Sequence, residues 1–107
     1  MKIAEMEFER LKEISKNVRM DIIEEVYSAQ SGHPGGALSC ADILTVLYFN
    51  QMNINPNRKD DENRDRFILS KGHASPALYA VLAERGYFSK DELKNFRKYG
   101  AMLQGHP

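Results

Sequence analysis

The three histidines of this 107-residue chain all follow a glycine. His33 and His106 each lie in a Gly-His-Pro sequence, and His73 lies in Gly-His-Ala. Glycine allows a backbone to approach a ligand closely, and an imidazole titrates near neutral pH, where it can hold or transfer a proton. The recurrence of one motif around every histidine favours binding or catalysis over a purely structural role. We therefore take His33, His73 and His106 as the candidate site residues.

His73 has the most informative surroundings. It follows Phe67-Ile68-Leu69, a short apolar run typical of a buried parallel strand, and it precedes a helix that should have Ser75 as its N-cap and Pro76 as its first residue. Open α/β sheets bind ligands where such a strand leads into a helix, and the N–H groups at the helix start favour a phosphate. The sequence predicts an anion-binding loop here, in which Lys71 either assists the anion or lies on the surface.

Other kinds of site remain open at this point. Three histidines can hold a catalytic zinc ion, although no two of them are spaced i, i+3 or i, i+4 here. The segment 31–36 resembles a phosphate-binding loop only loosely, because it lacks the Lys-Ser/Thr ending and follows no strand. Cys40 is the only cysteine, which excludes an intrachain disulfide, and we interpret it as a small buried side chain.

Two helices are expected in the first half of the chain. Apolar residues at spacings of three and four predict an amphipathic helix over residues 6–29, with Ile23 and Tyr27 widening its buried face. A second helix should begin near Ser39, with Asp42 completing a variant of the capping box. The apolar residues that follow predict that this second helix is buried on most sides.

Two more helices are expected in the second half. One should carry Pro76 in its first turn and end at Gly86, and the next should run from Ser89 to about Gly100. Residues 56–66 carry eight charges in eleven positions and should form a solvated connection.

This order of elements predicts an α/β fold that is mostly helical, with one short strand. A single parallel strand has unsatisfied N–H and C=O groups along both edges, so it needs neighbouring strands. We therefore expect an incomplete piece of a larger α/β domain, with exposed apolar surface and a tendency to associate.

Composition excludes several classes of partner. The chain has 15 Lys and Arg against 15 Asp and Glu, so its net charge of zero gives no reason to expect nucleic acid or an anionic membrane as a partner. The most apolar stretch, residues 43–49, is far shorter than the roughly 20 residues that a membrane span needs. With no signal-peptide core in the first 20 residues, we expect a soluble, cytoplasmic protein.

Three motifs together resemble transketolase. They are Ser31–Gly36, Leu69–Ala74 and Leu103–Pro107, and their order and spacing are similar to those of its N-terminal portion. The resemblance covers residues from about 10 to 107. The short segment before the first helix resembles the split form, which is made as separate N-terminal and C-terminal subunits. Deoxyxylulose-phosphate synthase, a related thiamine enzyme, fits less well because its first turn is of the Gly-His-Leu-Gly type.

The resemblance implies an enzyme that uses thiamine diphosphate to move a two-carbon ketol unit from a ketose phosphate to an aldose phosphate. It implies that His33 lines the substrate channel and serves proton transfer. It further implies that His73 reaches the cofactor diphosphate and the reaction centre, and that His106 contacts the donor sugar.

The resemblance also implies what these 107 residues lack. The Gly-Asp-Gly motif and the downstream Asn that hold magnesium in the family are absent, and the glutamate that activates thiamine belongs to another chain in split enzymes. We therefore expect residues 1–107 to be an incomplete thiamine-diphosphate domain, inactive alone, with magnesium ligands elsewhere. Its expected partners are sugar phosphates and a C-terminal subunit, in a homo-oligomer or heterotetramer. The alternative is a stand-alone helical interaction module whose Gly-His turns are connections.

Overall fold

The computed structural model describes residues 2–29, 34–70, 74–96 and 103. Within these ranges the chain forms helices and irregular segments, and no strand. The three α-helices are α1 (Lys2–Ala29), α2 (Pro34–Val46) and α3 (Ser75–Arg85). A π-helical segment, η1 (Leu47–Gln51), continues α2, and two 3-10 segments are η2 (Pro56–Arg58) and η4 (Lys90–Asn95).

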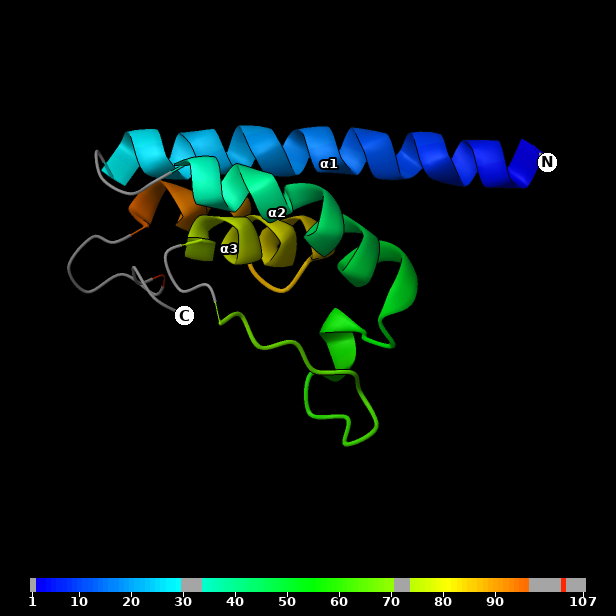
Figure 1. Cartoon of the computed structure of the whole chain (residues 1–107). Helices are drawn as coiled ribbons and strands as arrows, with labels where there is room; N and C mark the ends of the chain where they lie inside the picture. The colour runs from blue at the N-terminus through cyan, green and yellow to red at the C-terminus, as the bar shows by residue number, and fades with distance from the viewer. Residues whose placement is uncertain (1, 30–33, 71–73, 97–102, 104–107) are drawn as a thin grey trace.

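The helices pack into a small bundle around α3 (Figure 1). Helix α3 contacts both α1 and α2, and η4 covers α1 and α3 at one end. Helices α2 and α3 run in the direction opposite to α1, and the N-terminal part of α1 projects beyond the rest of the molecule. The described helices include no stretch with the length and apolarity that crossing a bilayer requires.

Small side chains allow α2 and α3 to approach each other closely. Ala37 and Ala41 of α2 and Ala74, Ala77 and Ala80 beside or within α3 are fully buried in one core cluster. Larger side chains from α1 and α2 complete that cluster, namely Val18, Ile22 and Leu44. A second cluster contains Tyr79, Ala83, Leu93, Phe96 and Leu103. The rings of Tyr79 and Phe96 meet edge to face, with their centroids 5.9 Å apart.

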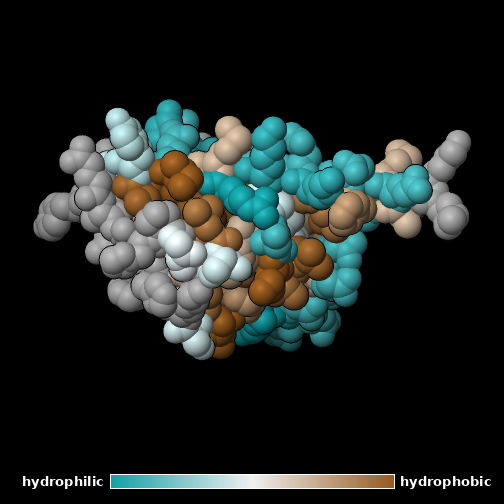
Figure 2. Space-filling model, turned by 45° about the horizontal axis from the view of Figure 1, so that its top comes forward, coloured by the Kyte–Doolittle hydropathy of each residue, from teal (hydrophilic) through white to brown (hydrophobic). Residues whose placement is uncertain are grey.

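Helix α1 begins at Lys2, four residues earlier than predicted, and its buried face is narrower. Ile23 is 50% exposed and Tyr27 is 81% exposed, so the prediction that both widen the buried face is wrong. They lie beyond the edge of the area that α2, α3 and η4 cover. On the face shown in Figure 2, hydrophobic patches lie among hydrophilic side chains.

Helix α2 begins at Pro34, so the prediction of a start near Ser39 is wrong. Proline suits a first helical turn because its missing N–H would have no partner there. The Ser39 hydroxyl donates to the Gly36 carbonyl, and Asp42 bonds to α1 instead of completing a capping box. Ile43 is 62% exposed, so α2 is less buried than predicted.

The predicted strand at Phe67–Leu69 is irregular in the structure, and Ile68 is 87% exposed. A strand needs a neighbour to accept and donate its backbone hydrogen bonds, and the described residues supply none. The α/β prediction is therefore confirmed only in part. Phe67 and Leu69 still pack against the first core cluster.

In the second half of the chain, the predicted end of α3 and the predicted exposed connection agree with the structure. Gly86 ends α3 with φ +103°, and its N–H bonds to the carbonyls of Leu82 and Ala83, as predicted. The prediction that Ser75 is the N-cap is wrong, because Ala74 is the N-cap and Ser75 is buried in the first turn of α3 with Pro76. The predicted fourth helix is the 3-10 segment η4, and residues 97–100 lie outside the described residues. The connection over residues 56–66 is largely exposed, as predicted.

Candidate functional site

The predicted site residues His33, His73 and His106, together with Lys71, lie outside the described residues. The structure describes the segments that lead to and from them. These segments show from which part of the fold each histidine-containing loop departs.

The residues that follow two of the loops pack together. Helix α2 begins at the residue after His33, and Ala74, at the start of α3, is the residue after His73. Ala37 of α2 and Ala74 belong to the same core cluster and are both fully buried. In Figure 1, α2 and α3 begin at the same end of the molecule.

The nearest described residues before His33 and before His106 belong to or pack against the second core cluster. Ala29, the last residue of α1, packs against the cluster that contains Leu103 and Tyr79. Leu103 is three residues before His106, and Ala29 is four residues before His33. Each histidine therefore has, within four residues, at least one described residue that packs in one of two clusters that share α3.

This end of the molecule has features that suit an anion. The first turns of α2 and α3 carry the partial positive charge of a helix N-terminus, and both helices are long enough for it to be substantial. A Cβ added to Gly35 would meet nothing within 4 Å, so there is open space beside the start of α2. For a metal ion, the described residues offer no cluster of three His, Cys, Asp or Glu side chains.

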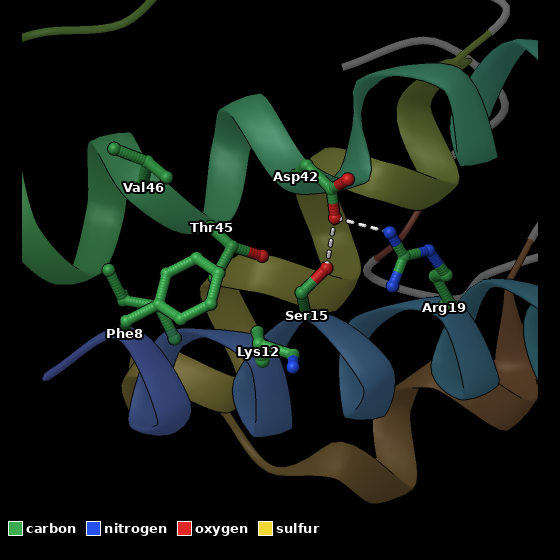
Figure 3. A pocket seen from close by; sticks show the side chains of 8 residues that line it. Phe8, Lys12, Ser15, Arg19, Asp42, Thr45 and Val46 are labelled. Carbon is green, nitrogen blue, oxygen red and sulfur yellow. Dashed lines mark hydrogen bonds and ion pairs between the residues drawn. The ribbon is translucent and has the colours of Figure 1, made fainter. Parts of the chain in front are cut away.

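A separate groove of about 450 Å³ lies between α1 and α2 (Figure 3). Phe8, Leu11 and Val46 give it an apolar part, and Ser15, Arg19 and Asp42 meet at its polar end. The Ser15 hydroxyl and the Arg19 guanidinium both donate to Oδ1 of Asp42. No imidazole accompanies this serine among the described residues, so the cluster lacks a base of the serine-hydrolase type. We interpret it as a polar tie between the two helices.

Cys40 is half-buried, with its Sγ 3.4 Å from the carbonyl oxygen of Ala37. Cys40 is therefore less buried than predicted. A thiol bonded to its own helix has a local structural role.

Sequence reasoning missed a group of buried carboxyl groups where α1, α3 and η4 meet. Asp21 and Glu25 of α1 are buried, and Glu84 of α3 is nearly so. Lys90 of η4 places its Nζ 2.7 Å from Oε2 of Glu84 and 3.5 Å from Oδ1 of Asp21. The available signal was the position of Asp21 and Glu25 on the same helical face as Ile22.

Burial dominates the titration of these groups. Burial, reinforced by the hydrogen bond and the charge of Glu84, raises the pKa of Asp21 to about 7. Burial also opposes ionisation of Glu84, but its hydrogen bonds with Asp21 and Lys90 outweigh it and lower the pKa of Glu84. Glu25 has no such compensation, and burial followed by the charge of Asp21 raises its pKa to about 10.

Comparison with known proteins identifies the family. Residues 10–107 match the family described as transketolase, thiamine diphosphate binding domain, and this chain belongs to that family. The resemblance inferred from the three histidine motifs is thereby confirmed.

Individual relatives carry more specific names. The chain is 41% identical, over 95% of its length, to one of the subunits of apulose-4-phosphate transketolase of Phocaeicola vulgatus. It is 44% identical, over 83% of its length, to 6-deoxy-6-sulfo-D-fructose transketolase subunit SqwG of a Clostridium strain, and 41% identical over 96% to human transketolase. It spans 36% of the first protein, 32% of the second and 16% of the third.

Solved structures agree with this assignment. The chain superimposes on transketolase from Leishmania mexicana with a TM-score of 0.86 and 35% sequence identity, over 91% of this chain and 15% of that one. A transketolase mutant from Pichia stipitis gives a TM-score of 0.81 at 41% identity. These likenesses do not favour the stand-alone interaction module or deoxyxylulose-phosphate synthase.

Proposed function

We propose that this chain supplies part of the cofactor and substrate site of a transketolase, which transfers a two-carbon ketol unit from a ketose phosphate to an aldose phosphate. Family membership supports the reaction class. The observation that supports the site is that Ala29, Ala37, Ala74 and Leu103, which flank the three loops, pack in two clusters that share α3. Thiamine diphosphate, when bound, supplies the carbanion stabilisation on which such transfers depend.

Chain connectivity supports a role for His73 beside the cofactor diphosphate. His73 is bonded directly to Ala74, which is fully buried at the start of α3. Consecutive Cα atoms are about 3.8 Å apart, so the covalent link to Ala74 supports a role for His73 at the first turn of this helix. The N–H groups of that turn favour a phosphate there, and a neutral imidazole can donate a further hydrogen bond.

His33 and His106 are assigned to the sugar substrate. Each is separated by at most four residues from a described residue that packs with the second cluster, a reach of roughly 15 Å for an extended chain. Imidazoles suit this role because they titrate near neutral pH and can bind sugar hydroxyls or move a proton.

The proposed active form contains more than these residues. We propose that residues 1–107 form an incomplete thiamine-diphosphate domain, and that magnesium ligands and the thiamine-activating glutamate lie elsewhere. Two relatives are named as subunits of transketolases. By analogy, the domain works with a C-terminal subunit, in a homo-oligomer or heterotetramer.

The test is steady-state ketol transfer by the complete enzyme, with thiamine diphosphate and magnesium supplied. His73→Ala should raise the thiamine diphosphate concentration needed for half-maximal activity by at least about tenfold, the usual value of a hydrogen bond to a charged group. His33→Ala and His106→Ala should lower kcat/KM for the donor by about 100-fold or more, as expected when a proton-transferring or transition-state contact is lost.

Asp60→Asn provides the matched control, because Asp60 is exposed in the charged connection. It should leave both kinetic parameters unchanged. Wild-type kinetics in all three histidine variants would show that the histidines are structural and would refute the proposed roles.

A further inference from the structure

The Glu25 side chain is completely buried, although it carries a titratable carboxyl group. Its exposed fraction is 0%, and neither carboxyl oxygen has a hydrogen-bond partner among the described residues. Glu25 lies on the face of α1 that packs against α3 and η4, one turn beyond Ile22 and one turn before Ala29.

The surrounding charges do not compensate this carboxyl. The charge that acts on Glu25 from α1 is that of Asp21, which is negative, and on α3 the charged group at this junction is Glu84, which is hydrogen-bonded to Asp21. On η4, Lys90 pairs with Asp21 and Glu84, and Lys94 lies 4.0 Å from Glu24. The remaining charged groups of η4 are Asp91 and Glu92, which add negative charge. Within the described part of the chain, no cation pairs with Glu25.

Glu25 is therefore protonated while the helices are packed in this way. An ionised carboxylate without a hydrogen-bond donor costs several kcal/mol in a buried position. The pKa of Glu25 is raised to about 10 by burial and, secondarily, by the charge of Asp21. Ionisation of this group requires that water reach it.

Segment η4 is the element best able to admit that water. It is a six-residue 3-10 segment held to the bundle mainly by buried Leu93 and Phe96 and by the lysine contacts. Short 3-10 segments have poorer hydrogen-bond geometry than α-helices. The contact between α1 and α3, by contrast, includes the first core cluster.

We propose that η4 is a proton-dependent latch on α1, which is closed while Glu25 is protonated and opens as Glu25 ionises. Closing the latch keeps the proton on Glu25. The free energy that this proton contributes to closure is therefore fully present below the ordinary carboxyl pKa, and it is lost as pH rises towards the pKa of the closed state. The latch involves only the contact of η4 with α1 and α3, so it stands or falls independently of transketolase chemistry.

Hydrogen exchange of the full chain tests the latch. The N–H groups of Glu92 and Phe96 bond to the carbonyls of Ser89 and Leu93 within and beside η4, so they report its opening. From pH 7.5 to 9, above the titration of Asp21, their protection factors should fall by up to about tenfold per pH unit. The protection of Val81, in the core of α3, should fall less.

The variant Glu25→Gln is nearly isosteric and stays neutral, so its η4 protection should not change over this pH range. Glu24→Gln is the matched control, because Glu24 is exposed next to Glu25 and should keep the wild-type pH dependence. Glu25→Met, with circular dichroism to verify folding, replaces the glutamine variant if that one does not fold.

Three results would overturn the latch. The first is a protection of Glu92 and Phe96 that does not change with pH in the wild type. The second is an unchanged pH dependence in the neutral variants. The third is a parallel loss of Val81 protection, which would mean that the whole bundle opens.

Discussion

Arg85 illustrates how single side chains hold this bundle together at its irregular points. Its Nε donates to the carbonyl of Tyr48, 3.0 Å away, and its Nη2 donates to the carbonyl of Ile54, 3.3 Å away. The guanidinium also lies over the Phe49 ring, 5.9 Å from the centroid. The end of a helix leaves carbonyls without intrahelical partners, and Arg85 satisfies one of them in η1.

Gly86 and Gly35 provide a test of what a glycine does in this chain. Gly86→Ala should lower the free energy of unfolding by about 1–2 kcal/mol, because φ +103° strains any residue with a Cβ. The nearest atom to that Cβ is Pro56 Cγ at 3.8 Å, so no clash adds to this cost. Gly35→Ala, in the first turn of α2, should be neutral or slightly stabilising. Urea unfolding monitored by circular dichroism measures both, and equal effects would contradict the backbone argument.

Residues whose role depends on sequence neighbours were predictable. Gly86 ends α3 because the left-handed conformation is needed at the residue after a helix, and sequence position alone indicates it. Asp42 was misjudged because its partners, Ser15 and Arg19, are more than twenty residues away. Glu25 was missed for a related reason, since a stripe of apolar residues gives no sign that a carboxyl shares their burial.

At the scale of elements, α2 shows that neighbouring residues of one apolar run can differ completely in burial. Ile43 and Leu44 are adjacent, yet Ile43 is 62% exposed and Leu44 is 1% exposed. The run itself predicts burial for both, because hydrophobicity does not reveal which side of a helix has a neighbour. In this fold α1 and α3 cover one side of α2 only.

The two residues make a matched pair of substitutions. Leu44→Ala should lower the free energy of unfolding by about 2–5 kcal/mol, the usual cost of a cavity in a core. Ile43→Ala should change it by less than about 0.5 kcal/mol, as for other surface positions. Urea denaturation of both variants distinguishes them, and a large loss from Ile43→Ala would mean that its face is covered in solution.

The strand prediction failed at the same scale. A continuous run such as Phe67–Leu69 suits a buried strand, but strand formation depends on hydrogen bonds to another segment. The described helices can satisfy their own backbone groups locally, which is why α1 and α3 were predictable in type and approximate extent. The histidine loops were recognisable from motif spacing, while their geometry is outside the described residues.

At the scale of the whole molecule, exposed apolar side chains are concentrated on α1 and α2. They include Phe8, Met20, Ile23, Tyr27 and Ile43, and Figure 2 shows such patches among hydrophilic ones. Exposed large apolar side chains gathered on two helices are typical of faces that other protein covers. The chain spans only about a third of the transketolase subunits it matches, which accords with that view.

Cofactor affinity should therefore depend on assembly. Isothermal titration calorimetry of the 107-residue chain with thiamine diphosphate and magnesium should give little heat, because the described residues offer no metal cluster to bridge the diphosphate. The same titration with the complete enzyme is the control and should show binding. Tight, magnesium-dependent binding by the chain alone would contradict the proposal that the domain is incomplete.

The connection over residues 52–70, which follows η1, has a consequence for proteolysis. Arg58, Lys59 and Arg66 are exposed there, on backbone that no regular element protects apart from one short 3-10 turn. Trypsin should cleave this connection faster than it cleaves the helices. Because α3 is packed against both α1 and α2, the two resulting fragments would remain associated, and the same site would tolerate an inserted sequence.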